Sequence, residues 1–271
     1  MRVRFWGVRG SVPWATPAAI GHGCNTPCVE VFDEASGERL VLDAGSGIVG
    51  LGETLTAAPA PIPILLSHYH WDHLQGLPFF APLYRRDWPL TILAPALESY
   101  EAGWMESIFR SPFFPVPFER LPRPPAVRII DAGHVGIGCF DVQSIRLNHP
   151  GGALAYRIRG ANATGADLVY ASDHELGVPD VDGPLAAFIA GAGAVIFDAH
   201  FTQEEEAAHR GWGHSTWEGA VRFCAEAGVG RLWLFHHKPG RTDLELTDIE
   251  AQARQILPAT DAAGEGDVFE V

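Results

Sequence analysis

The stretch LLSHYHWDH, residues 65–73, constrains the fold more than any other part of the sequence. An apolar run typical of a buried strand leads directly into four side chains of the kind that bind metals: His68, His70, Asp72 and His73. In an extended segment, side chains two residues apart point the same way, so His68 and His70 share a face. Asp72 and His73 fall on the next turn and face another part of the same pocket. One short segment can therefore serve two neighbouring metal ions.

Short β-rich runs bounded by Gly, Pro and Asp recur along the whole chain. We expect strands in RVRFWGV, CVEVFD, RLVLDAG, PIPILLS, LTILAP, VRIID, FDVQSIRLN, LAYRIRG, DLVYASD, AVIFDAH and RLWLFHH. Helices are fewer: one near Asp72 and others at about 184–190, 202–209, 215–228 and 247–256. For the last two, Ser215 with Glu218 and Thr247 with Glu250 predict capped starts. Without strict alternation, this pattern indicates an α/β (α+β) protein in which helices cover layers of sheet.

The 271 residues are expected to form a single domain, residues 1–271. A segment at about 78–125 differs from the rest because it is rich in proline and aromatic residues. Its irregular part is interpreted as an insertion that passes over a cleft, with a packed surface loop as the alternative. Phe113, Phe114 and Phe118 in this segment could stack on a nucleotide base, form a hydrophobic lid or make a dimer contact.

Charge and composition narrow the partners. With 19 Lys and Arg against 33 Asp and Glu, the net charge of −14 argues against loose binding of a large nucleic acid. The longest apolar run, residues 185–197, is shorter than the roughly 20 residues that span a bilayer. The N-terminus lacks the apolar segment of a signal peptide. The four cysteines are too few and too scattered for a disulfide framework. A cytoplasmic protein that makes no use of a membrane is expected.

The metal-binding stretch matches the HxHxDH signature of the metallo-β-lactamase superfamily, and the resemblance extends along the chain. VLDAGSG, residues 41–47, is similar to the family's early turn that carries an Asp. LNHPGG, YASDH and LWLFHH then supply His149, Asp173 and His236 in the family's order. The resemblance implies the αββα four-layer sandwich, with metals at one edge.

Carried over to this sequence, the resemblance implies a two-metal centre. One ion would be held by His68, His70 and His149, and Asp173 would bridge to the other ion. The second ion would be held by the remaining ligands: Asp72, His73 and His236. A donor set of imidazoles and carboxylates without a thiolate suits Zn²⁺ or Mn²⁺, and Fe²⁺ is also compatible. His236 is preferred to its neighbour His237 because the family's last ligand directly follows a strand, but the sequence leaves both open.

Within the superfamily, residues 197–237 resemble the phosphodiesterase branch that includes ribonuclease Z and smaller cyclic-phosphodiester hydrolases. In that branch an acidic residue after a strand and a His-Ser-Thr motif form a proton-donating pair, and Asp198 and His214 occupy those positions here. The resemblance to flavodiiron proteins fails at His70, where they carry Glu, and the Cys ligand of many β-lactamases is replaced by Asp173. His214 could alternatively serve only to begin a helix, although Ser215 already fills the cap.

The resulting hypothesis is metal-dependent hydrolysis of a small phosphodiester, such as a cyclic nucleotide. Asp72 would bind metal and orient the attacking group, while Asp198 and His214 would protonate the departing oxygen. Two alternatives stay open: a carboxyl-ester or lactone hydrolase with the same ligands, and a ribonuclease Z-like RNA endonuclease. The chain lacks the basic, glycine-rich arm of ribonuclease Z enzymes. A non-catalytic module is disfavoured because the ligand set is complete. A homodimer is expected from the resemblance, while His200 and Lys238 have no assigned role.

Overall fold

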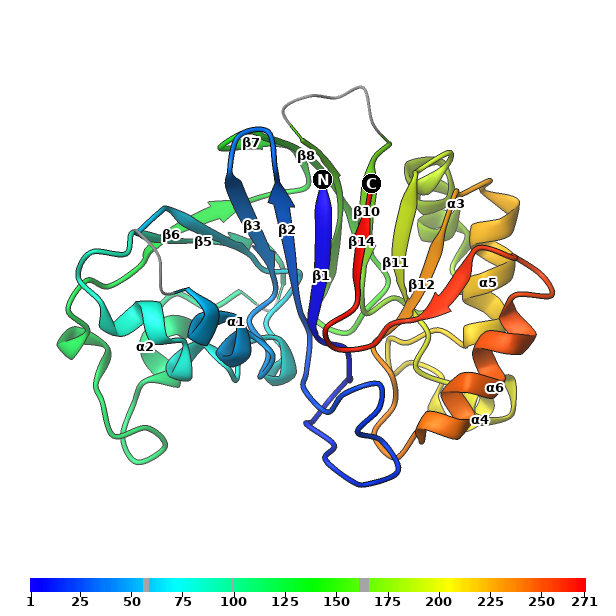
Figure 1. Ribbon diagram of the computed structural model, residues 1–271, viewed down its shortest axis with the longest axis horizontal. Coiled ribbons are helices and arrows are strands. Elements are labelled where there is room, and N and C mark those ends of the chain that lie inside the picture. Colours follow the sequence, from blue (N-terminus) through cyan, green and yellow to red (C-terminus); the bar gives the residue numbers. More distant parts are fainter. Residues whose placement is uncertain (56–58, 99, 161–165) are drawn as a thin grey trace.

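Two seven-stranded sheets face each other at the centre of the molecule and are covered by helices on their outer faces (Figure 1). The computed structural model describes residues 1–55, 59–98, 100–160 and 166–271. The first sheet has the order β14 (Val268–Glu270), β1 (Arg2–Gly7), β2 (Cys28–Asp33), β3 (Glu38–Leu42), β4 (Ile62–Leu65), β5 (Leu90–Pro95) and β6 (Ala126–Ile130). The second has the order β13 (Thr260–Ala262), β12 (Leu232–Phe235), β11 (Ala194–Asp198), β10 (Leu168–Ala171), β9 (Ala153–Arg159), β8 (Phe140–Leu147) and β7 (Gly133–Ile137).

Three apolar layers hold the sheets and helices together. The inner faces of the two sheets meet in a core that includes Phe5, Tyr156 and Phe235, all without solvent exposure. The first sheet is covered by α1 (Ile48–Thr54) and α2 (Trp104–Ile108), and the second by α3 (Pro179–Ile189), α5 (Trp217–Glu226) and α6 (Asp243–Ala253). Since each fully buried large apolar side chain contributes roughly 1.5–3 kcal/mol, the three layers together stabilise the predicted αββα architecture. That prediction is confirmed.

The strand directions bring the ends of several strands to one edge, which we call the rim. In the first sheet β3, β4 and β5 are parallel, and in the second sheet β10, β11 and β12 are parallel. Strand β8 is antiparallel to β9, which is antiparallel to β10, so β8 also ends at the rim. The carboxyl ends of parallel strands meet at the same edge, where open α/β sheets bind their ligands. The polar residues that follow these strands are therefore delivered to one place.

Several predicted boundaries are wrong in an informative way. Helix α5 is capped by Thr216, whose side chain accepts a hydrogen bond from the Gly219 amide, while the Ser215 hydroxyl bonds the His174 carbonyl instead. Helix α6 begins at Asp243 with Thr242 as its cap, four residues before the predicted Thr247. The predicted helix near Asp72 is a single 3₁₀ turn, Trp71–His73. Helix α4 (Gln203–His209) begins after Thr202 as predicted.

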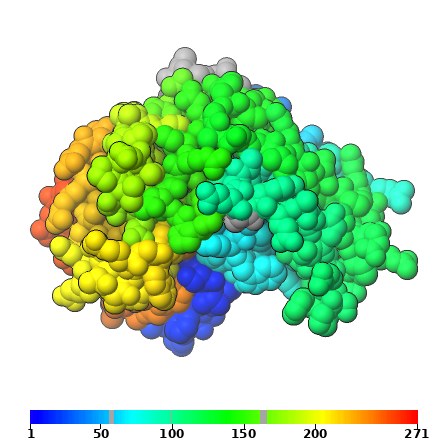
Figure 2. Space-filling view, turned by 180° about the vertical axis from the view of Figure 1, so that it is seen from behind, coloured from blue at the N-terminus to red at the C-terminus, as the bar shows by residue number. Residues whose placement is uncertain are grey.

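The aromatic segment at 78–125 is partly a regular component of the fold. It contains β5 of the first sheet, and much of the remainder packs on the outer face of that sheet around buried Phe109. Phe114 and Phe118 lie 5.5 and 5.7 Å from the Phe109 ring, whereas Phe113 is 83% exposed. Figure 2 shows the segment, coloured from cyan to green, as a lobe on one side of the molecule. Among the described residues, no helix is long and apolar enough to cross a bilayer.

Candidate metal centre

The seven predicted ligands converge at the rim in two groups. The first group joins His68 and His70, which follow β4, to His149, which follows β8. The Nε2 atom of His149 lies 3.0 Å from Nδ1 of His70. The Oδ2 atom of Asp173 lies 3.7 Å from Nε2 of both His68 and His149. These four side chains form a preformed pocket of the size and donor type that a divalent ion requires.

The second group comprises Asp72, His73 and His236, and it lies beside the first. The Nε2 atom of His236 is 3.1 Å from Oδ2 of Asp72 and 3.4 Å from Nε2 of His73. The Oδ1 atom of Asp173 is 3.2 Å from Nε2 of His73 and 3.3 Å from Nε2 of His236. Each carboxylate oxygen of Asp173 thus faces a different group, which is the position of a bridging ligand.

The choice between the two adjacent histidines is resolved by their surroundings. His236 adopts a left-handed backbone conformation, with φ of 61°, and turns its ring into the cluster. The His237 ring points elsewhere, because its Nε2 bonds the Ala263 carbonyl at 2.9 Å. The preference for His236 agrees with this geometry.

Buried charge provides a test of whether the cluster suits metal ions. Four carboxylates are almost fully buried at the rim: Asp43, Asp72, Asp173 and Asp198. In the described part of the chain, every ion-pair partner of these four groups is a histidine. The buried Nε2 atom of His68 has no hydrogen-bond partner there. Buried negative charge requires compensation, and an unpartnered imidazole nitrogen beside it is a vacant ligand atom. The residues fit divalent cations.

The pKa shifts follow from the same arrangement. Burial lowers the pKa of His68 well below its ordinary value and lowers that of His149 to about 4, so both rings are neutral and able to bind metal. Burial alone would raise the pKa of Asp173, but the surrounding imidazoles of His236, His73 and His68 hold it well below its usual range. The cluster therefore presents ionised Asp173 and the neutral rings of His68 and His149, the forms that coordinate metals. For His73, burial alone would lower the pKa, but Asp173 and the other nearby carboxylates raise it well above its ordinary value, so this ring must release its proton to bind a metal.

Further side chains hold the ligands in place. The Oδ2 atom of Asp43 accepts hydrogen bonds from Nδ1 of His73 at 2.8 Å and from the hydroxyls of Ser67 and Tyr170 at 2.7 Å. Tyr170 belongs to the second sheet, so Asp43 also links the sheets across the core. Such outer partners fix the tautomer and direction of a ligating imidazole. The early turn at residues 41–47 supports the site in the way the sequence predicts.

Backbone strain is concentrated at the same place. Among the described residues, the non-glycine positions with positive φ are Ser11, Asp43, Asp173 and His236. The last three carry the side chains just described, and the Ser11 amide donates to Oδ2 of Asp72 at 2.7 Å. Residues in this conformation each cost about 1–3 kcal/mol and persist where surrounding contacts impose them. The sequence contains no signal that would have identified Ser11 as a contact of the site.

A glycine before Ser11 gives the ligands room. A Cβ atom on Gly10 would lie 2.4 Å from the His236 ring and 2.9 Å from Nδ1 of His200. Any side chain here would displace a ligand, so the N-terminal loop approaches the cluster by its bare backbone.

The two residues of the predicted proton-donating pair lie in contact with each other, beside the predicted metal ligands. Nδ1 of His214 lies 2.7 Å from Oδ2 of Asp198, at the end of β11, and 3.9 Å from Oδ2 of Asp173. Burial opposes the charge on His214, but Asp198 and the other nearby carboxylates raise its pKa to about 9. The pair therefore favours a charged imidazole whose Nε2 is free to donate.

The unassigned histidines separate into two kinds. His200 belongs to the site: its ring stacks on His214 at 4.4 Å, and its Nδ1 bonds the His236 carbonyl at 2.8 Å. The others have local partners outside the cluster: Asp243 for His22, Asp141 for His134, Asp182 for His174 and Phe201 for His209. Lys238 does not face the cluster either, because Glu205 binds its Nζ atom at 2.7 Å.

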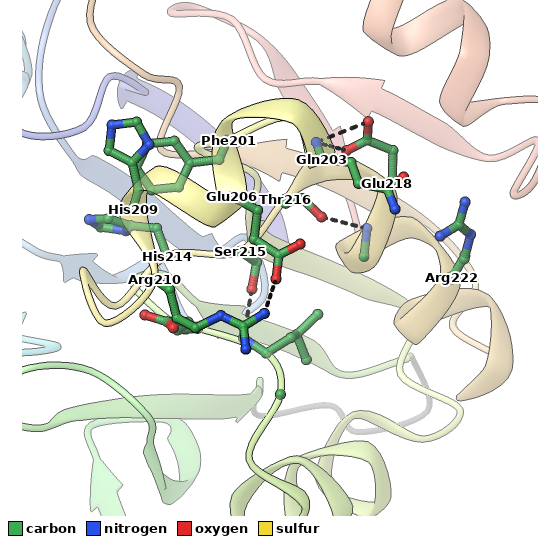
Figure 3. A pocket seen from close by; sticks show the side chains of 14 residues that line it. Phe201, Gln203, Glu206, His209, Arg210, His214, Ser215, Thr216, Glu218 and Arg222 are labelled. Carbon is green, nitrogen blue, oxygen red and sulfur yellow. Dashed lines mark hydrogen bonds and ion pairs between the residues drawn. The ribbon is translucent and has the colours of Figure 1, made fainter.

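Two cavities lie at this part of the rim, one beside His214 and the other beside His149. One of about 230 Å³ is lined by His214, Phe201 and the start of α5, with Arg210 and Glu206 at its edge (Figure 3). The other, of about 570 Å³, is lined by His149, Pro150 and the 211–213 turn. Glu175 and Arg210 border both cavities. Their volumes suit a small substrate or one part of a larger one.

Comparison with known proteins now places the chain. The model of the beta-lactamase superfamily domain matches residues 38–237, which include all seven predicted ligands. The chain belongs to the beta-lactamase superfamily. As a member of this superfamily, it is a metal-dependent hydrolase, in agreement with the prediction from the sequence.

Individual proteins are similar over nearly the whole chain. Ribonuclease Z of Bradyrhizobium sp. strain ORS 278 is 28% identical, and the match covers 97% of each protein. The metallo-beta-lactamase fold protein YhfI of Bacillus subtilis has a TM-score of 0.71 at 22% identity, covering 99% of both chains. A diphosphatase of the PhnP family gives 0.72 at 16% identity, covering 100% of this chain and 97% of that one. The short form of human tRNase Z gives 0.69 at 20%, covering 100% and 99%.

Proposed function

We propose that the chain is a dinuclear metal-dependent phosphodiesterase that acts on a small phosphodiester such as a cyclic nucleotide. The observation that carries this proposal is the Asp198–His214 pair, 2.7 Å apart, beside the bridging position of Asp173. An alkoxide leaving from a phosphodiester is a poor leaving group unless it is protonated. A charged histidine held by a carboxylate meets that requirement. Nitrophenolate and many lactone leaving groups need protonation much less.

The residues have separate roles in the proposed mechanism. His68, His70, His149, Asp72, His73 and His236 would hold two divalent ions, Zn²⁺ or Mn²⁺ with Fe²⁺ also compatible, and Asp173 would bridge them. Such ions polarise phosphoryl oxygens and make a bound water acidic. Asp72, whose Oδ2 accepts a hydrogen bond from the Ser11 amide, would orient the attacking water. His214 donates its Nε2 proton to the departing oxygen, and Asp198 keeps the ring aligned through Nδ1.

The size of the substrate is inferred from charge and shape. The net charge of −14 opposes a large polyanion, and cavities of about 230 and 570 Å³ beside His214 and His149 suit a small one. One observation favours an RNA endonuclease as the second candidate: the match to the Bradyrhizobium ribonuclease Z covers 97% of both chains.

A substrate panel tests these alternatives. Metal-stripped protein is reloaded with Zn²⁺ or Mn²⁺ and assayed with 2′,3′- and 3′,5′-cyclic nucleotides, dinucleotides, a precursor transfer RNA and a simple lactone. We expect the cyclic nucleotides or dinucleotides to give the highest kcat/KM. Preferred cleavage of the transfer RNA would establish the second candidate. Preferred hydrolysis of the lactone would remove the phosphodiesterase assignment.

A further inference from the structure

Glu175 makes a set of contacts that no role in the proposed chemistry yet accounts for. It lies two residues after Asp173, is half-buried and borders both cavities near the metal centre. Its carboxylate accepts hydrogen bonds from the Gly211 amide at 2.8 and 2.9 Å and from the Gly213 amide at 2.7 Å. No ion-pair partner of Glu175 is found among the described residues, so its charge is committed to this turn.

The turn that Glu175 holds touches both halves of the site. The Gly213 carbonyl accepts a hydrogen bond from Nδ1 of His149 at 2.9 Å, which directs the opposite nitrogen, Nε2, toward the metal ligands. His214 is the next residue along the chain. The turn therefore sets the direction of a metal ligand and the position of the proton donor at the same time.

The two glycines contribute no side-chain packing to the turn, although the Trp212 ring between them lies 4.8 Å from the His209 ring. Gly211 and Gly213 have φ of 85° and 88°, and a Cβ atom on Gly213 would lie 2.2 Å from Nδ1 of His149. Two glycines near each other leave the backbone free to adopt other conformations, at an entropic cost to the ordered form. The carboxylate of Glu175 compensates by fixing both amides.

The backbone of Glu175 is also held in place by hydrogen bonds. Its amide donates to the Asn148 carbonyl at 2.9 Å, and Nδ2 of Asn148 donates to its carbonyl at 2.8 Å. Asn148 directly precedes His149. These hydrogen bonds join the loop after β8 to the loop after β10. The side chain of Glu175 then connects both loops to the 211–213 turn.

We propose that Glu175 is a positioning residue that couples the metal ligand His149 to the proton donor His214 through the 211–213 turn. The effect on His214 rests on the proposed function. The effect on His149 does not, because metal affinity can be measured without any substrate. Loss of Glu175 should therefore produce two linked effects: weaker binding of one metal ion and poorer protonation of the leaving group.

The test uses the metal-stripped full chain and three variants. Glu175→Ala removes the side-chain contacts, while Glu175→Gln keeps one oxygen able to accept from both amides. Glu204→Ala is the matched control, because Glu204 is an exposed glutamate of α4 that lines neither cavity. Zn²⁺ and Mn²⁺ are titrated calorimetrically, and kcat/KM is compared for phosphodiesters with alkyl and nitrophenyl leaving groups.

For Glu175→Ala we expect one of the two ions to bind at least about tenfold more weakly, as for other outer partners of metal ligands. The alkyl-to-nitrophenyl ratio of kcat/KM should fall in the same variant. Glu175→Gln should recover most of both effects, and Glu204→Ala should match the unaltered protein. Metal affinities within twofold of the unaltered protein in both Glu175 variants would overturn the proposal. A changed metal affinity with an unchanged alkyl-to-nitrophenyl ratio would also overturn the proposal, because Glu175 would then not couple His149 to His214. Absence of metal binding by the unaltered protein would instead refute the proposed function itself.

Discussion

The two sheets contribute to the metal centre in opposite ways. The first sheet supplies four of the proposed ligands within residues 68–73, directly after β4. The second sheet supplies one proposed ligand after each of three strands: His149 after β8, Asp173 after β10 and His236 after β12. The first contribution depends on local backbone geometry. The second depends on strand pairing and register over almost ninety residues, so it forms only when the whole sheet is assembled.

Because the two sheets contribute differently, the residues that link them can be identified: Asp173 and Asp43. Asp173 comes from the second sheet, yet each of its oxygens faces ligands from the first, His68 through Oδ2 and His73 through Oδ1. Asp43 makes the reverse connection from the first sheet to Tyr170 of the second. Substitutions at such positions should affect both groups of ligands, whereas a substitution within the local stretch should affect one.

The largest expected effect is that of Asp173→Ala compared with His70→Ala. Removing Asp173 leaves both groups one ligand short, so we expect less than one tightly bound ion per chain. Activity should fall by more than about 100-fold, since even outer partners of metal ligands cost 10–100-fold. His70→Ala should lose one ion and retain the other. Elemental analysis after reloading with Zn²⁺ and an assay with bis(p-nitrophenyl) phosphate measure both quantities. Retention of two ions by Asp173→Ala would disprove the bridging role.

The next largest effect is that of His214→Ala, which distinguishes the role of the proton donor from that of the metal ligands. The second sheet positions His214 as well as three of these ligands. His214→Ala should lower kcat/KM for a phosphodiester with an alkyl leaving group by about 10²–10⁴-fold, the usual contribution of a general acid. A nitrophenyl ester, whose leaving group needs no proton, should lose less than about tenfold. Equal losses on both substrates would remove the general-acid role. Metal content measured in parallel shows whether His214→Ala also disturbs the neighbouring ligands.

The sequence predicted the local contribution more completely than the assembled one. The HxHxDH stretch and most strands follow from periodicity and residue type, because these are properties of neighbouring residues. The second-sheet ligands were identified by resemblance and by their place after apolar runs, and no spacing rule could have put His149 and His236 each within 4 Å of Asp173. His200, Ser11 and Glu175 were missed as parts of the site because their contacts depend on loops that meet only in the folded chain.

The errors in secondary structure have the same origin. Strands β7, β13 and β14 were not predicted: the last two have three residues each, and β14 owes its conformation to pairing with β1. The cap of α5 was assigned to Ser215 instead of Thr216, since adjacent hydroxyl residues carry the same local signal. Ser215 is taken up by a long-range hydrogen bond to the His174 carbonyl, which local sequence cannot reveal.

The smallest expected effect concerns the loops that follow the second sheet, and it should separate stability from catalysis. Glu205 in α4 binds Nζ of Lys238 at 2.7 Å and Arg241 at 2.5 Å, just beyond His236. Burial would raise the pKa of Glu205, but these bonds and the Thr202 amide lower it to about 2 from 4.5. Because the folded pKa is below the unfolded one, the contribution to stability is complete above about pH 4.5 and is lost as the pH falls toward 2.

Glu205→Gln should therefore reduce the free energy of unfolding by about 1 kcal/mol at pH 7, since solvent screening reduces the upper bound of about 3 kcal/mol that the pKa shift implies. At pH 2.5 the difference should be much smaller, and the turnover of the reloaded enzyme at pH 7 should stay within twofold. Urea unfolding at the two pH values measures the first pair of quantities. Glu204→Gln, an exposed change in the same helical turn, is the control and should leave the stability unchanged. Glu205→Gln could instead reduce metal affinity with little loss of stability. The loop after β12 would then belong to the metal centre. The support for His236 would in that case extend along the chain to Lys238 and Arg241.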